Sequence, residues 1–170
     1  MTRGIALLIV ASLALVAVQI AIVSPLRIAG VVVMVVWLWP LALSLTSSTA
    51  VAVAAGFVTG LLFDAHTVTP FGLTALVGAA LAWFMSLLAR EGVGDLDGSA
   101  WWMPAILVAV GGLVAPVLFV VGGAVTGHVS LWHASVVPMM IVNFVVFFFL
   151  ARPVARVAQR IAATGGWTRA

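Results

Sequence analysis

The stretch Gly56-Phe-Val-Thr-Gly60-Leu-Leu-Phe-Asp64, followed by Pro70-Phe-Gly72-Leu-Thr-Ala75, decides the fold of this chain. Residues 52, 56, 60 and 64 are Ala, Gly, Gly and Asp, and this four-residue spacing places them along one face of a helix. Small side chains on such a face let two helix backbones approach closely within a membrane. The sequence therefore predicts a helix-packing motif, which consists of Ala52, Gly56, Gly60, Asp64, Pro70, Gly72 and Ala75.

The composition is that of an integral membrane protein. The chain has 170 residues, of which 65% are hydrophobic and only 6% are charged, and its mean hydropathy is +1.36. Soluble domains are about 45–50% apolar and about 25% charged. The net charge of +3 comes from seven arginines against four acidic residues. Because most of these arginines lie at the C-terminal end, they do not indicate a nucleic-acid-binding surface.

Apolar runs predict an all-α bundle of six transmembrane helices. A span needs about 20 residues to cross a hydrocarbon core of about 30 Å. The expected spans are 4–23, 27–45, 49–64, 71–89, 102–126 and 134–151. The first run is longer than the core of a secretory signal and no clear cleavage site follows it, which favours a membrane anchor. The third run is short and rich in Ala and Gly, and a re-entrant segment is the alternative there.

The two ends of the chain set the expected domain organisation and orientation. Residues 1–151 are predicted to form a single transmembrane domain, and 152–170 a basic cytoplasmic tail. Arg152, Arg156 and Arg160 are four residues apart, which predicts a short amphipathic helix on the anionic membrane surface. Since cytoplasmic loops carry an excess of basic residues, we expect both termini in the cytoplasm, with only Arg27 on the outer side.

Asp64 is the main candidate for a functional polar residue. Ionisable residues at membrane depth are functional hypotheses by default. Two roles are open from the sequence: Asp64 ends a helix through polar contacts with the turn before Pro70, or it carries protons or cations. The first is favoured, because the other acids all lie in one loop, 90–99. Thr69 and Pro70 are expected to start the next helix, and Gln19 and Asn143 to form interhelical hydrogen bonds.

The sequence indicates no catalytic, metal or cofactor site. There is no cysteine, which excludes thiol chemistry and thiolate metal sites. His66, His128 and His133 lack the spacing of helical metal-binding motifs. No nucleophile triad and no phosphate-binding glycine loop occur. We therefore predict a protein that is not an enzyme and that holds no cofactor.

With these residues in view, the chain resembles the bacterial rod shape-determining protein MreD family. The resemblance is carried by Gly56-x-x-x-Gly60-x-x-x-Asp64, a variable turn, and then Gly72-Leu-Thr-Ala75-Leu76. Gln19 before a proline-containing connection and a proline- and asparagine-bearing last span before a basic tail are also similar. The length and the number of spans agree with the family over the whole chain.

The resemblance implies a non-catalytic scaffold of the cell-elongation complex in the bacterial cytoplasmic membrane. It implies MreC as the direct partner, with RodA, a class B penicillin-binding transpeptidase and MreB in a larger complex. It also implies a fold similar to the substrate-binding S-components of energy-coupling-factor transporters. The alternative function is accordingly a vitamin-binding subunit of such a transporter, although a vitamin pocket needs several convergent polar groups.

Overall fold

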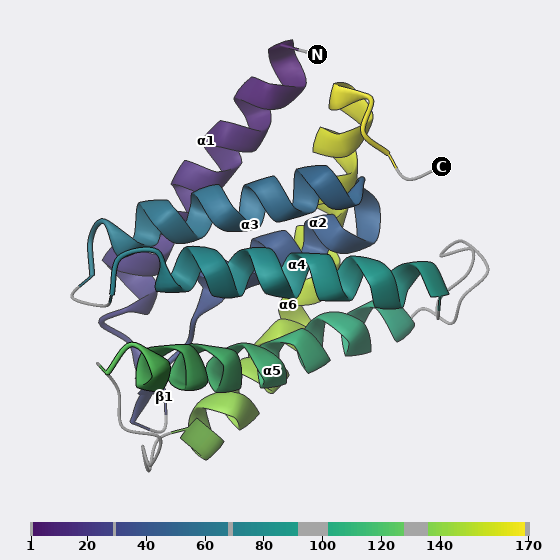
Figure 1. Cartoon of the computed structure of the whole chain (residues 1–170). Coiled ribbons are helices and arrows are strands. Elements are labelled where there is room, and N and C mark those ends of the chain that lie inside the picture. The colour runs from purple at the N-terminus through teal and green to yellow at the C-terminus, as the bar shows by residue number, and fades with distance from the viewer. Residues whose placement is uncertain (1, 29, 68–69, 92–101, 128–135, 169–170) are drawn as a thin grey trace.

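The structure is a computed structural model that describes residues 2–28, 30–67, 70–91, 102–127 and 136–168. Six α-helices make up most of it (Figure 1). The elements, in chain order, are α1 (Thr2–Val18), the π-helix η1 (Gln19–Val23), β1 (Arg27–Ile28), β2 (Val31–Val32), the 3-10 turn η2 (Val35–Trp37), α2 (Leu38–Thr46), α3 (Thr49–Asp64), α4 (Leu73–Glu91), α5 (Met103–Val125) and α6 (Val136–Gly165).

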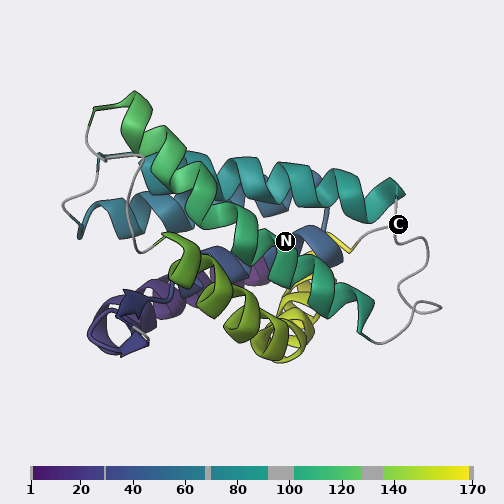
Figure 2. The ribbon, with the colours of Figure 1, turned by 90° about the horizontal axis from the view of Figure 1, so that it is seen from below.

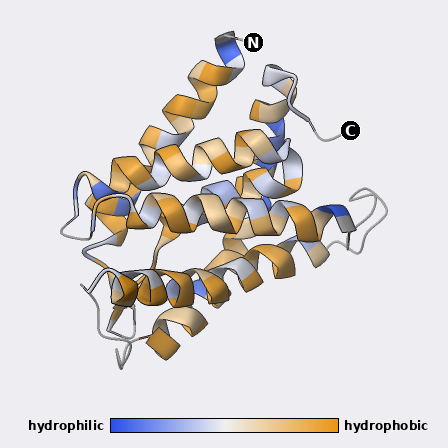
Figure 3. Cartoon of the chain, in the orientation of Figure 1, coloured by the Kyte–Doolittle hydropathy of each residue, from blue (hydrophilic) through white to orange (hydrophobic). Residues whose placement is uncertain are grey.

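Among the described residues, four helical segments are long and apolar enough to cross a membrane. They are Arg3–Val23, Leu73–Arg90, Met103–Val125 and Val136–Gly165. Figure 3 shows hydrophobic residues over most of their length, with hydrophilic ones at the start of α1, near the α3–α4 loop, at the end of α4 and in the later half of α6. The part of the chain that the structure describes is therefore that of an all-helical membrane protein apart from one two-stranded hairpin.

Helix α2 lies at the centre of the bundle. It contacts α3, α4, α5 and α6, and all nine of its residues are buried. A helix that is apolar on every side lies either in a protein core or against lipid, and α2 is in the first of these environments. Its neighbours are arranged around it as antiparallel pairs: α3 lies along α4, and α5 lies between α4 and α6 (Figures 1 and 2).

The predicted second span, 27–45, is wrong over residues 27–34. Its first residues form the antiparallel hairpin in which Arg27 pairs with Val32 and Ile28 with Val31, and helical structure begins only at Val35. The helix Val35–Thr46 is about 18 Å long and α3 about 24 Å, at 1.5 Å a residue, so both are shorter than the hydrocarbon core. Valine and isoleucine predominate in this hairpin, and β-branched residues suit strands.

The predicted boundary between a last span at 134–151 and a separate tail helix is also wrong. Helix α6 continues through Pro153 to Gly165. Its later half belongs to the packed bundle, because Ala158 and Ile161 are buried against Trp39 and Ala52. The apolar face of the tail therefore binds protein, while its arginines remain exposed.

The start of α1 and the end of α6 lie at one end of the bundle (Figure 1). A side chain on Gly4 would collide with the backbone of Gly165. The Ser48 backbone N–H donates to the Trp167 carbonyl at 3.0 Å, and Ser47 pairs with Thr168 in an isolated β-bridge. The start of α1, the α2–α3 connection and the end of α6 thus form one structural unit.

Candidate functional site

The candidate site is the contact between α3 and α4, together with the turn that joins them. Helix α3 buries residues at spacings of three and four along one face, which are Ala52, Ala55, Gly56, Thr59, Gly60, Phe63 and Asp64. This pattern is that of a helix with a single packing face. Most of these side chains are small, so the backbone of α3 can approach its neighbour closely.

Two glycine contacts bring the backbones of α3 and α4 together. A Cβ atom on Gly56 would lie 2.5 Å from the Gly78 carbonyl oxygen, and one on Gly78 would lie 2.7 Å from the Gly56 carbonyl oxygen. A Cβ atom on Gly60 would lie 2.5 Å from both Cα and N of Ala75. Each position has room for a hydrogen atom and for nothing larger. We call Gly56, Gly60, Ala75 and Gly78 the small-residue interface.

Asp64 ends α3 beside the small-residue interface and caps the start of α4. Its side chain is only 2% exposed. Its Oδ2 accepts hydrogen bonds from the backbone N–H groups of Gly72 at 2.9 Å, Thr74 at 3.0 Å and Ala75 at 3.3 Å, and Oδ1 lies 3.3 Å from the Thr74 nitrogen. A carboxylate is well placed here, because the positive end of the helix macrodipole adds to these bonds.

The remaining backbone donors at the start of α4 are also satisfied. The Leu73 N–H donates to the Pro70 carbonyl at 3.0 Å and the Leu76 N–H to the Gly72 carbonyl at 2.9 Å. Gly72 has φ +93°, a conformation that favours glycine, and it turns its N–H toward Asp64. Together, Asp64 and the turn carbonyl replace the side-chain cap that a helix start normally obtains from its own N-cap residue.

The structure places the predicted motif residues at this contact, with one change of role. Ala52 is fully buried on the same face of α3, and Pro70 contributes its carbonyl to the turn. The prediction that Thr69 and Pro70 begin the fourth helix is wrong for Pro70, because α4 begins at Leu73; Thr69 lies outside the described residues. The glycine of the turn, not the proline, stands at the N-cap position.

Gln19 and Asn143, which the sequence predicts to form interhelical hydrogen bonds, form a second polar feature by binding the unwound chain between β2 and α2. Gln19 Nε2 donates to the Val33 carbonyl at 2.9 Å, and Gln19 Oε1 accepts from the Val36 N–H at 3.2 Å. Asn143 Oδ1 accepts from the Met34 N–H at 3.1 Å. Both side chains are fully buried. They hold main-chain groups of 33–36 in place, and the sequence signal was their amide side chains within apolar spans.

The other polar residues singled out in the sequence do not join this site. Arg152, Arg156 and Arg160 are exposed on α6. His66 is exposed, and its Nδ1 lies 3.0 Å from the Leu62 carbonyl oxygen. His128 and His133 lie outside the described residues. Within the part of the chain that the structure describes, no three His, Asp or Glu side chains gather as metal ligands would.

Comparison with known proteins gives only a partial likeness. The threonine/homoserine exporter RhtA of Salmonella typhimurium (strain SL1344) is 34% identical over 83 residues, which are 49% of this chain and 26% of the exporter. RhtA of Escherichia coli (strain K12) is 32% identical over the same shares. The match thus covers about a quarter of the length of these curated relatives. No protein-family model matches the chain, and no solved structure matches it.

Proposed function

We propose that this protein is a non-catalytic scaffold of the bacterial cell-elongation complex, of the MreD type, and that it binds MreC. The observation that carries the proposal is the α3–α4 contact. The residues on which the MreD resemblance rests are Gly56, Gly60, Asp64, Gly72 and Ala75. They lie on two successive helices and the turn between them, and they meet in one packed unit. A motif that builds a rigid helical pair suits a protein whose task is to present a surface.

The environment of Asp64 also favours a scaffold over a proton or cation carrier. Its carboxylate oxygens accept hydrogen bonds from main-chain N–H groups at the start of α4. Those donors are fixed by the backbone and keep the carboxylate in one position. A carrier instead needs a carboxylate that exchanges its proton or ion with a pathway. We therefore assign Asp64 a structural role within the proposed function.

We further propose six membrane crossings in the bacterial cytoplasmic membrane, with both termini in the cytoplasm. Helices α2 and α3 are short, but α3 lies alongside α4 and returns the chain toward the opposite end of the bundle (Figure 1). Arg3 lies at the start of α1, Arg90 near the end of α4 and three exposed arginines in the later half of α6. These parts of the three helices lie toward the end of the bundle where α2 connects to α3 (Figure 1). The excess of basic residues on cytoplasmic loops favours this end as the inner one.

A small-molecule carrier is the second candidate, because the partial likeness is to an exporter of threonine and homoserine. A vitamin-binding transporter subunit belongs to the same class. Both would bind a small polar ligand within the bundle, and both differ from the scaffold in what they retain on purification.

Affinity purification followed by mass spectrometry tests the proposal. A tagged chain, extracted in mild detergent from cells that produce it at native level, should retain MreC, and RodA, the class B transpeptidase and MreB in smaller amounts. An unrelated multi-pass membrane protein with the same tag is the control for non-specific capture. Recovery of an ATPase module or a bound vitamin without MreC, or threonine export by reconstituted vesicles, would reject the scaffold.

A further inference from the structure

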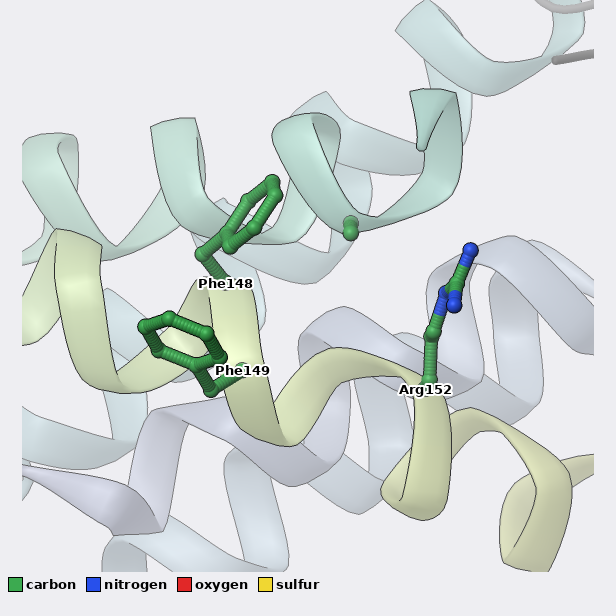
Figure 4. Close-up of a pocket in the computed structure, with 4 residues that line it drawn as sticks. Phe148, Phe149 and Arg152 are labelled. Carbon is green, nitrogen blue, oxygen red and sulfur yellow. The ribbon is translucent and has the colours of Figure 1, made fainter. Parts of the chain in front are cut away.

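An open hollow lies between α5 and α6. Its volume is about 280 Å³, and it is lined by Ala105, Phe148, Phe149 and Arg152. Figure 4 shows the two phenyl rings on one side of the hollow and the guanidinium of Arg152 on the other. The two rings meet edge to face, with their centroids 5.6 Å apart. The lining thus combines one cation with an apolar wall.

The position of the hollow at the start of α5 suits the depth where lipid headgroups meet acyl chains. Ala105 belongs to the first turn of α5, which starts at Met103. Trp102, just before that turn, is 44% exposed, and tryptophan is enriched at the headgroup level. Arg152 faces this turn, whereas Phe149 lies three residues earlier on α6, about 4.5 Å nearer the apolar middle of the helix at 1.5 Å a residue. Charge and apolar wall are therefore ordered as in a phospholipid.

Two features of the hollow attract an anion. The first is the exposed guanidinium of Arg152, which matches a phosphate with a planar set of donors. The second is the start of α5, where the helix macrodipole is positive and where the Trp102 side chain makes no capping hydrogen bond.

We propose that this hollow binds one anionic phospholipid. The phosphate lies on the Arg152 guanidinium, and the upper part of an acyl chain lies against Phe148 and Phe149. Phe149 is 71% exposed, so its ring extends the apolar wall along the outer surface of α6. This binding requires no particular protein partner. It is more specific than a general attraction of the basic helix to the membrane, because the lipid binds at Arg152 and not at Arg156 or Arg160.

Native mass spectrometry of the purified full-length chain tests the assignment. The probes are phosphatidylglycerol and phosphatidylcholine with identical acyl chains, and free glycerol phosphate as a headgroup without chains. Arg152→Gln is compared with Arg156→Gln, since both arginines are exposed on α6 and only Arg152 lines the hollow. Phe149→Ala is compared with Phe57→Ala, which removes a 48% exposed ring from α3. Thermal unfolding of each variant checks that the fold is unchanged.

We expect the parent chain to retain one phosphatidylglycerol in preference to phosphatidylcholine. Arg152→Gln should weaken this binding about fivefold, the effect of one arginine beside an anionic headgroup, and Phe149→Ala should weaken it measurably. Arg156→Gln and Phe57→Ala should leave the affinity within about twofold of the parent, because neither residue lines the hollow. Equal losses for Arg152→Gln and Arg156→Gln would overturn the assignment. Lack of preference for phosphatidylglycerol, or full competition by glycerol phosphate, would overturn it as well.

Discussion

Gly60→Ala is the substitution that tests the small-residue interface most directly, because it adds a single methyl group. The new Cβ would lie 2.5 Å from the Cα and the backbone nitrogen of Ala75. Ordinary carbon contacts are about 3.5–4.0 Å, so α4 must move away by about 1 Å. The atoms in contact belong to the backbone, which cannot rotate aside as a side chain can.

The same movement weakens the cap at the start of α4. Asp64 Oδ2 lies 2.9 Å from the Gly72 nitrogen and 3.0 Å from the Thr74 nitrogen, and these bonds cross the gap that must widen. A shift of about 1 Å takes both beyond a normal hydrogen-bond length. Overpacking costs about 1–3 kcal/mol and loss of a cap about 1–2 kcal/mol, against a gain of about 1 kcal/mol in helix propensity. We expect a net loss of about 1–4 kcal/mol in the free energy of unfolding.

Unfolding by sodium dodecyl sulfate in mixed micelles measures this loss. Gly122→Ala is the matched control, because its added methyl would meet only the flexible end of the Leu73 side chain, with Cδ1 at 2.6 Å. That variant should be as stable as the parent or slightly more stable, since it keeps the propensity gain. If Gly60→Ala is as stable as Gly122→Ala, the close backbone contact between α3 and α4 is not a constraint on this protein.

Three further predictions follow from the buried polar groups and the topology. Asp64→Ala should cost about 1–3 kcal/mol by leaving buried N–H groups without an acceptor, and Asp64→Asn, which keeps one acceptor oxygen, should cost less; thermal unfolding in detergent ranks the two. Asn143→Leu should cost about 1–3 kcal/mol by stranding the Met34 N–H, whereas Ser12→Ala, which removes a buried hydroxyl without a hydrogen-bond partner, should be nearly neutral in the same assay. Reporter proteins fused after Ala170 and inserted after Thr67 should report opposite compartments, and a periplasmic C-terminus would reject the proposed orientation.

Composition and hydropathy were sufficient to predict a helical membrane protein. Long apolar runs such as 102–126 and 71–89 correspond within a few residues to α5 and α4. Such runs are readable because a lipid environment accepts only backbone that satisfies its own hydrogen bonds, and a helix does so within one segment. The spacing of Gly56 and Gly60 likewise pointed to one helix face, because that periodicity is a property of the helix itself.

The hairpin and the unwound segment before α2 could not be predicted from the same signal. Residues 27–36 are as apolar as a transmembrane span, so hydropathy alone does not distinguish the two. The segment is non-helical because Gln19 and Asn143, which are 14 or more positions away in sequence, satisfy its backbone groups. Long-range partners of this kind are tertiary information. The partners of Asp64 were missed for the same reason: the sequence indicated a turn but not which N–H groups the carboxylate would bind.

The buried polar side chains described above share one use, which bears on how Asp64 is to be tested. Gln19, Asn143 and Asp64 each engage main-chain groups where a helix begins or the chain is unwound. An unsatisfied backbone group in a membrane interior costs several kcal/mol, so these contacts have a structural justification that needs no ligand.

A functional role for the charge of Asp64 therefore requires more than loss of activity in Asp64→Ala, which removes the cap and the charge together. Asp64→Asn separates them. Under the proposed scaffold function, an Asp64→Asn variant that folds with near-parental stability and still supports elongation would show that capping α4 is sufficient to explain the residue. If it folds normally but no longer retains MreC or supports elongation, the charge is used by a partner and the purely structural assignment is wrong.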